Sequence, residues 1–387
     1  MRVLIAGAGV AGAAAAIALR RTGADVDVYE SHPDPGGEVG SFVSLAANGL
    51  RGLGALGRLD AVRGAGVEVE RLRVHSADGA LLSDTPRGRR EHDALRSVTL
   101  LRGRLVEALR AQAEREGVRI RTGDRLVGVR DLGDRVAAVL DGGDAPEGDL
   151  LVGADGIWSA ARRSLLPEAP PPRYAGLYTL SGTSDPDRAG SAADPRAVRM
   201  RYTHAGGVFF HVGTPDGRIW WSAQVPSADE PERPTSPVGA DRLAALAAAY
   251  RDDPLPAAIV SATVRAHPFT VMHAMDPVPA WTGGRTVLIG DAAHPVGAGQ
   301  GASMALEDAL VLAGLVGGGE DVPGALAAYR SERAPRIERV LGMAAANRAM
   351  KKAGPAAPGA AAGLAPEEDM EAFADWLYGY DPCAPVR

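Results

Sequence analysis

The sequence is short of cysteine and of positive charge, and both shortages narrow its possible functions. A single thiol, Cys383, excludes an internal disulfide framework and a cysteine-based metal cluster, so we expect no metal site. With 42 basic and 48 acidic residues the net charge is -6, so no basic surplus neutralises the phosphates of a nucleic acid. No apolar run reaches the roughly 18 residues of a membrane-spanning helix, which predicts no stable membrane insertion. Met1 and Arg2 lead straight into a strand pattern, not a signal peptide, so we expect a cytoplasmic location.

Glycine, by contrast, is abundant, with 49 residues, and three glycine-bearing segments organise the chain. They span 7–12, 153–162 and 290–301, and each follows a short apolar run and opens a helical pattern. The turn after a buried strand is a general ligand-binding position in α/β proteins. Three such turns in this order indicate a site that holds FAD along its whole length. The length of 387 residues predicts two domains, or one nucleotide-binding domain with an insertion.

The first segment has the residues of a dinucleotide-binding turn. Gly7 permits the tight turn, Gly9 lets the backbone approach a pyrophosphate, and Gly12 allows close packing of helix on strand. The helix start supplies free N–H groups and a partial positive charge. Glu30, 23 positions after Gly7, ends the next strand, where its carboxylate can bind a ribose diol and would repel a 2′-phosphate. This predicts FAD or NAD rather than NADP, and a glycine turn without a ligand is the alternative.

Acidic residues follow the other two strands. Asp155 and Asp291 each stand near the end of an apolar run, where α/β sheets bind ligands. For Asp155 the alternative is a simple cap of the following helix. The segment 299–301 starts a helix whose N–H groups can face the O2/N1 edge of a flavin ring, which becomes anionic on reduction. His294, between these features, is either a general base or a structural residue of the turn.

These segments resemble the FAD-dependent aromatic monooxygenases of the p-hydroxybenzoate hydroxylase fold, the class A flavoprotein hydroxylases. Segment 101–109 is similar to a family helix whose arginine contacts FAD, and 307–309 matches the family's Glu-Asp-Ala. The ending 376–381 is similar to that of salicylate- and urate-hydroxylase-like members. One departure is the stretch between His294 and Gly299, whose four residues are fewer than in the commoner family pattern. The resemblance implies that FAD is bound by Gly7, Gly9, Ala11, Gly12, Glu30, Ser31, Val43, Arg102, Leu126, Asp155, Gly156, Gly290, Asp291, Pro295, Gly299, Gln300 and Gly301.

The resemblance also implies the fold, an α/β protein in which a Rossmann-like FAD-binding domain carries an inserted antiparallel-sheet substrate domain and C-terminal helices. The alternating patterns and Asp-Gly turns within the expected insertion independently indicate an antiparallel sheet. The expected domains are an FAD-binding domain at 1–70, 98–175 and 275–320, a substrate domain at 71–97 and 176–274, and a C-terminal helical region at 321–387 with a mobile stretch at 351–366.

The implied function is monooxygenation. NAD(P)H, a transient co-substrate, would reduce a tightly but non-covalently bound FAD. O₂ would then form a flavin C4a-hydroperoxide that hydroxylates, epoxidises or oxidatively decarboxylates an aromatic or heteroaromatic small molecule. The residues expected to line the substrate site are Arg201, Phe209, His211 and Trp221, and a plain sheet or surface role is the alternative for each. A non-catalytic flavin- or ligand-binding protein remains a second hypothesis. A related halogenase or reductase ranks lower, because Trp220-Trp221 are adjacent and the halogenase pattern W-x-W-x-I-P is absent.

Overall fold

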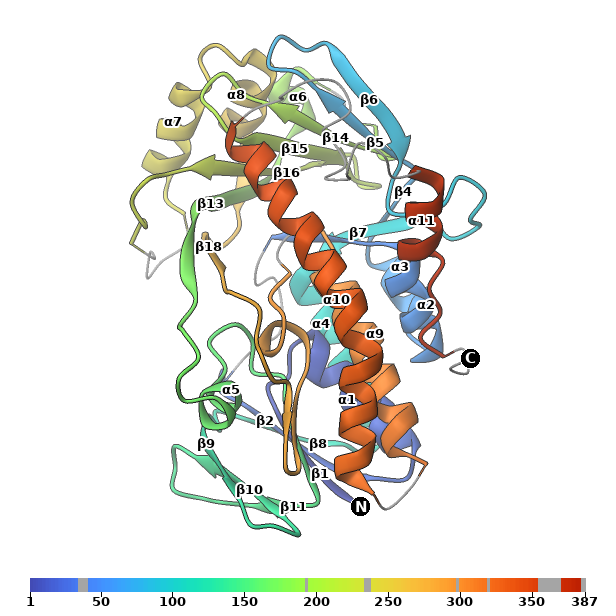
Figure 1. Cartoon of the computed structure of the whole chain (residues 1–387). Coiled ribbons are helices and arrows are strands. Elements are labelled where there is room, and N and C mark those ends of the chain that lie inside the picture. The colour runs from blue at the N-terminus through green and yellow to red at the C-terminus, as the bar shows by residue number, and fades with distance from the viewer. Residues whose placement is uncertain are drawn as a thin grey trace.

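The computed structural model describes residues 1–33, 41–191, 194–232, 238–296, 299–318, 321–353 and 370–383 (Figure 1). Its lower part is built on a six-stranded sheet in the order β19-β20-β12-β1-β2-β8. The strands are β1 (Arg2–Ala6), β2 (Asp25–Glu30), β8 (Arg119–Thr122), β12 (Leu150–Gly153), β19 (Thr282–Gly283) and β20 (Thr286–Leu288). All neighbours are parallel except β19 and β20. The strands before the three glycine turns, β1, β12 and β20, are therefore adjacent.

Buried helices cover this sheet. The first is α1 (Val10–Arg21), whose alanine-rich middle has almost no exposed surface. Small side chains around the whole helix let it pack between the sheet and a second buried helix, α9 (Gly301–Val316). The long helix α10 (Val322–Ala353) lies against α9 and runs from the six-stranded sheet towards the upper part of the molecule (Figure 1). The further helices here are α2 (Ala47–Ala55), α3 (Leu59–Gly64), α4 (Arg102–Arg115), α5 (Ala160–Leu165) and α11 (Met370–Tyr378).

The upper part is an eight-stranded, mostly antiparallel sheet with two different faces. Its strands are β5 (Arg71–His75), β6 (Leu81–Pro86), β13 (Arg173–Ser184), β14 (Ala197–Tyr202), β15 (Val208–Gly213), β16 (Ile219–Pro226), β17 (Thr263–Ala266) and β18 (Thr270–Ala274). Helices α7 (Ala240–Ala249) and α8 (Pro254–Ser261) cover one face, which we call the helix-covered face. The opposite face, which carries Phe210 and Trp220, we call the cofactor-side face. It packs against Val67 and Val69 of a smaller sheet.

That smaller sheet consists of β3 (Phe42–Leu45), β7 (Ser97–Leu101) and β4 (Val67–Val69) and connects the two large ones. The remaining elements are a sheet of β9 (Leu126–Asp131), β10 (Val136–Leu140) and β11 (Glu147–Gly148), the short helix α6 (Pro186–Ala189) and a 3₁₀ turn at Gly290–Ala292. The predicted fold class is confirmed, whereas the exact domain boundaries stay a prediction. The expected mobile stretch 351–366 begins inside α10, and from residue 354 it lies outside the described residues. None of the described helices is long and apolar enough to span a membrane.

Candidate cofactor and substrate site

The three glycine turns meet at one edge of the six-stranded sheet. Ala6 is paired with Gly153, and Gly153 with Leu288, so the three strands end side by side. A Cβ atom on Gly7 would approach the Ala154 carbonyl oxygen to 2.5 Å. The turns therefore touch, and together they form one continuous cradle at the carboxyl ends of neighbouring parallel strands.

The first turn has the shape that a pyrophosphate requires. Gly7 has a φ of 97°, in the left-handed region that favours glycine. A Cβ atom on Gly12 would lie 1.8 Å from the Gly7 carbonyl oxygen, so the helix can approach this closely only with glycine there. At Gly9 a Cβ atom would meet no described neighbour within 4 Å, so it would point into open space before the helix. No side chain of the described residues caps α1, which leaves its first N–H groups for a ligand.

Glu30 joins the end of β2 to this turn. Its Oε2 accepts a hydrogen bond from the Ala8 amide at 2.7 Å, and its Oε1 accepts one from the His32 amide at 2.8 Å. The Ser31 hydroxyl lies 3.3 Å from the same Oε1. Since each carboxylate oxygen can accept more than one hydrogen bond, Glu30 can hold the turn and still accept from ribose hydroxyls.

Asp155 caps the following helix with one carboxylate oxygen and leaves the other available. Its Oδ2 accepts hydrogen bonds from the amides of Ala160 at 2.7 Å and Ala161 at 3.1 Å, as a helix cap does. Its Oδ1 is buried and has no partner among the described residues. A buried carboxylate oxygen without a partner is costly, so this atom is well suited to receive a ligand hydroxyl.

Asp291 lies in the third turn, beside the start of α9. A Cβ atom on Gly301 would be 3.8 Å from the Asp291 Oδ1. Asp291 is exposed at the surface, although protein atoms surround its carboxyl group. This burial raises the pKa of Asp291, while the nearby charges of His294 and Arg102 lower it. The structure thus brings Arg102, at the start of α4, electrostatically close to the third turn, although Arg102 lies far away in the sequence.

His294 is buried within this turn. Only 2% of it is exposed, and its Nε2 lies 2.6 Å from Oδ2 of Asp308, which also accepts a hydrogen bond from the Gly290 amide at 2.9 Å. Burial tends to raise the pKa of Asp308, but the charges of His294 and Arg333 and these hydrogen bonds hold it well below its usual range. A histidine held in this way can position the backbone of the turn, while its Nδ1 is buried and has no partner among the described residues.

A buried ion-pair network extends from Asp308 along α9 to α10. Arg333 donates to Asp308 at 2.9 Å and to Glu307 at 2.7 Å. Arg336 donates to both oxygens of Glu307 at 2.7 and 2.8 Å. The Asn48 amide donates to Glu307 at 2.8 Å, and it lies 3.4 Å from Gln300 at the start of α9. Sequence reasoning singled out the two acids but missed both arginines, because no spacing pattern links them to α9.

The other expected cofactor residues occupy varied positions. Gly299 has a φ of 124° and Gly156 a φ of 74°, and a Cβ atom on either would meet no described atom within 4 Å. The buried Pro295 and Gln300 flank residues 297–298, which are not described. A Cβ atom on Gly290 would lie 2.9 Å from the Cβ of Ala11. Val43 lies half-buried in β3, and Leu126 is buried at the start of β9.

The residues expected to line the substrate site lie on the helix-covered face. Phe209 and Trp221 have no exposed surface, and their rings stack at a centroid distance of 5.8 Å. Tyr250, which follows α7, packs edge-on against Phe209 at 5.9 Å. These two rings therefore form the core between the sheet and its helices, so the alternative role as plain sheet residues holds for them.

His211 and Arg201 share this face. Burial, together with Arg199 and Arg201, lowers the pKa of His211 to about 3, so this histidine stays neutral. Arg201 donates a hydrogen bond to the Ala77 carbonyl at 3.2 Å. All four residues thus lie on the helix-covered face, and their expected role in lining the substrate site stays a prediction.

The cofactor-side face presents other polar and aromatic side chains, of which the sequence had indicated only Gln224. Trp220 stacks on Phe42 of β3 at a ring-centroid distance of 6.5 Å. This face therefore lies against the small sheet that also carries Val43, one of the expected cofactor residues. Gln224 and Ser181 lie on the same face by strand register. Their Oε1 and Oγ atoms are buried and have no partner in the described part of the chain. The signal was present in the alternation itself, since these residues alternate with those on the helix-covered face.

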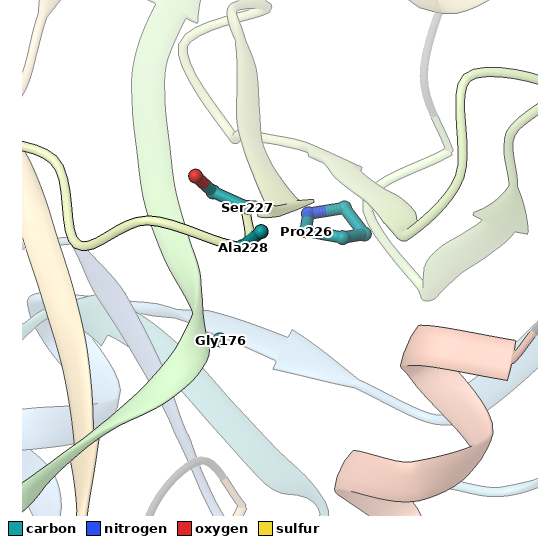
Figure 2. A pocket seen from close by; sticks show the side chains of 4 residues that line it. All are labelled: Gly176, Pro226, Ser227 and Ala228. Carbon is teal, nitrogen blue, oxygen red and sulfur yellow. The ribbon is translucent and has the colours of Figure 1, made fainter.

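An open hollow lies at the end of this sheet. Figure 2 shows its lining, which is Gly176, Pro226, Ser227 and Ala228, beside strand β13. Its volume is about 410 Å³. Because Pro226 follows Gln224 on β16, the hollow continues the polar part of the cofactor-side face.

The cradle and the second sheet together define a class of protein, the flavoproteins in which a Rossmann-like part faces an antiparallel substrate sheet. The chain matches the model of the family described as FAD binding domain over residues 1–344, and it belongs to that family. It binds FAD and is an oxidoreductase of the flavin monooxygenase kind.

The relatives support this class. The chain is 33% identical over 347 residues to "Aurachin C monooxygenase/isomerase" of Stigmatella aurantiaca, covering 87% of this chain and 86% of the relative. It is 31% identical over 364 residues to "3-hydroxybenzoate 6-hydroxylase 1" of Aquipseudomonas alcaligenes, covering 87% and 86%. Among solved structures, Klebsiella pneumoniae HpxO complexed with FAD and uric acid shares the fold, with a TM-score of 0.77, 23% identity and coverage of 98% and 93%.

Proposed function

We propose that this enzyme is an NAD(P)H- and O₂-dependent monooxygenase that adds one oxygen atom to an aromatic small molecule. One observation carries the proposal. The three turns form a single cradle, and the face of the second sheet that carries partnerless polar atoms looks towards the same part of the molecule. A substrate held on that face lies beside a cofactor held in the cradle.

The chain's own residues support the following roles for the bound cofactor. The open position at Gly9 and the uncapped α1 suit the pyrophosphate, and Glu30 suits a ribose. Asp155 and Asp291 suit the hydroxyls between pyrophosphate and ring. The first N–H groups of α9 favour the negative charge that a reduced flavin ring carries. FAD supplies the redox chemistry when it is bound, taking electrons from NAD(P)H and activating O₂.

The cofactor-side face supports an aromatic substrate. Phe210 and Trp220 offer ring surface, while Gln224 offers a carbonyl oxygen that can accept from a phenol or an amine. Holding the substrate there positions it and excludes water from the reaction. Relatives named for hydroxybenzoate, kynurenine and urate indicate the same class of planar compound.

The test is a visible spectrum followed by turnover. We expect a yellow protein whose NAD(P)H oxidation is stimulated by one member of a panel of phenols, aromatic acids and indoles. Mass spectrometry with ¹⁸O₂ should then show one labelled oxygen in the product. A colourless protein that cannot be reconstituted with FAD contradicts the proposal. A yellow protein that binds panel members without oxidising NAD(P)H supports the non-catalytic ligand-binding alternative.

A further inference from the structure

Three basic side chains gather where the end of α10 meets the upper sheet. Arg348 and Lys351 lie in the last turns of α10, and Arg87 follows strand β6. The positive charges of Arg87 and Arg348 are close enough to Lys351 to repel its charge. We call these three residues the basic cluster.

The basic cluster has no acidic partner among the described residues. No described carboxylate forms an ion pair with any of its members, in contrast to the buried Arg333 and Arg336, which share Glu307. Burial and the repulsion from both arginines lower the pKa of Lys351 to about 8. Burial also lowers the pKa of Arg87 and of Arg348. All three side chains are half-buried. Half-buried cations without an acidic partner among the described residues are suited to bind an anion.

The cluster adjoins the cofactor-side face. The Nζ atom of Lys351 lies 5.3 Å from the centre of the Phe210 ring, which belongs to that face. The residue after Arg87, Gly88, accepts a hydrogen bond from the Ala47 amide at the start of α2 at 2.8 Å. The cluster thus lies between the substrate sheet and the cofactor-binding part, and Figure 1 shows the end of α10 reaching the sheet at β15 and β16.

A second, independent observation points to a ligand at this face. Gln224 is 7% exposed and Ser181 2%, and each has a buried oxygen that no described residue satisfies. Ser222 pairs with Phe210, and Gln224 is the next residue of β16 on the same face. Hydrogen-bonding atoms, an aromatic ring and unpaired cations therefore lie along one surface.

We propose that the substrate is an aromatic carboxylate whose carboxylate group is bound by Arg87, Arg348 and Lys351, with its ring against Phe210. This inference rests on the proposed function and specifies its substrate. An arginine binds a carboxylate in a bidentate manner, and Lys351 adds a point charge beside an apolar ring. A phosphate of NAD(P)H is the other possible anion, but the ring of Phe210 beside the cations favours an aromatic acid.

The test uses matched probes that differ only in charge, 3-hydroxybenzoate with 3-hydroxybenzamide and salicylate with salicylamide. Each is titrated into the FAD-loaded enzyme, and the visible spectrum of the flavin reports binding. We expect the acids to bind at least about tenfold more tightly than the amides. Arg87→Met and Lys351→Met should each raise the Kd of the acids about tenfold or more and leave the Kd of any amide that binds within about twofold.

The control is Arg251→Met, which removes a cation between α7 and α8, where the side chain is 81% exposed. It should change neither Kd. Acids that bind no better than amides, or variants that lose affinity for both alike, overturn the inference. If Arg87→Met and Lys351→Met raise the KM for NADPH but leave the Kd of the acids unchanged, the inference is also overturned, and the cluster binds the co-substrate instead. Stimulation of NAD(P)H oxidation by neutral aromatics alone would leave the proposed function standing while this inference fails.

Discussion

At the scale of single residues, Gly9 shows how the lack of a side chain makes room for a ligand. Any side chain here would enter the space in front of α1. We expect Gly9→Asp to lower FAD affinity by at least tenfold, about 1.4 kcal/mol, because a carboxylate would repel the pyrophosphate. The ratio of flavin to protein absorbance after gel filtration measures the loss.

The control for this change is Gly142→Asp. A Cβ atom on Gly142 likewise meets no described atom within 4 Å, but the residue lies in an exposed turn after β10. It should keep its flavin. A Gly9→Asp protein that retains FAD like the control would show that the pyrophosphate is bound elsewhere.

A substitution of His294 can distinguish a structural role of this residue from a catalytic one. Its hydrogen bond to Asp308 is buried and short, at 2.6 Å. We expect His294→Asn to lower the free energy of unfolding by about 2–3 kcal/mol, because Asp308 would lose a buried partner. The turnover of the flavin-loaded fraction should change less than about threefold, as measured beside urea unfolding. A large loss of kcat with unchanged stability would instead make His294 the general base.

At the scale of elements, the ion-pair network fastens α9, α10 and α11 together. Arg336 binds Glu307 and also donates to the carbonyls of Trp376 and Leu377, at 2.9 and 2.8 Å. We expect Arg336→Met to destabilise the protein by about 3 kcal/mol, because a buried carboxylate loses one of its cations. Limited proteolysis should then cut faster near α11.

Arg330→Met is the matched control. Arg330 lies on the same helix, and its exposed side chain donates a hydrogen bond to the Pro279 carbonyl. The free energy of unfolding of Arg330→Met should stay within about 0.5 kcal/mol of the wild-type value. Equal effects of the two changes would mean that the network adds nothing beyond surface contacts.

The elements also show what could be predicted from the sequence. The strands before the glycine turns follow from local apolar runs, and the turn chemistry follows from Gly7, Gly9 and Gly12, since both depend on residues close in the chain. Alternation correctly placed Phe209 and His211 on one face. It could not tell which face looks towards the cofactor, because that is decided by packing against α7 and α8, including Tyr250 and Ile259. Likewise, nothing local indicated that Arg333 would meet Asp308.

At the scale of the whole molecule, we expect the basic cluster to lower the stability of the fold while it provides the charge that binds the substrate. The pKa of Lys351 is about 8 in the folded protein, against 10.5 for a free lysine. Below pH 8 the folded state holds a charge that its surroundings disfavour. Between pH 8 and 10.5 the unfolded chain binds the extra proton, so this unfavourable contribution fades as the pH rises.

We therefore expect Lys351→Met to raise the stability of the ligand-free holoenzyme at pH 7 by about 1–3 kcal/mol, the full shift being reduced by partial solvent access. The advantage should shrink as the pH rises from 8 to 10.5. The measurement is thermal unfolding of the wild type and the variant across this pH range. Groups that both proteins share, such as Tyr378 beside Arg87, titrate in both and therefore cancel in the stability difference. If Lys351 instead stabilises the protein by its packing, Lys351→Met should be less stable than the wild type at every pH. A more stable variant that has lost affinity for aromatic acids would show that the enzyme keeps an unfavourable charge in order to bind its substrate.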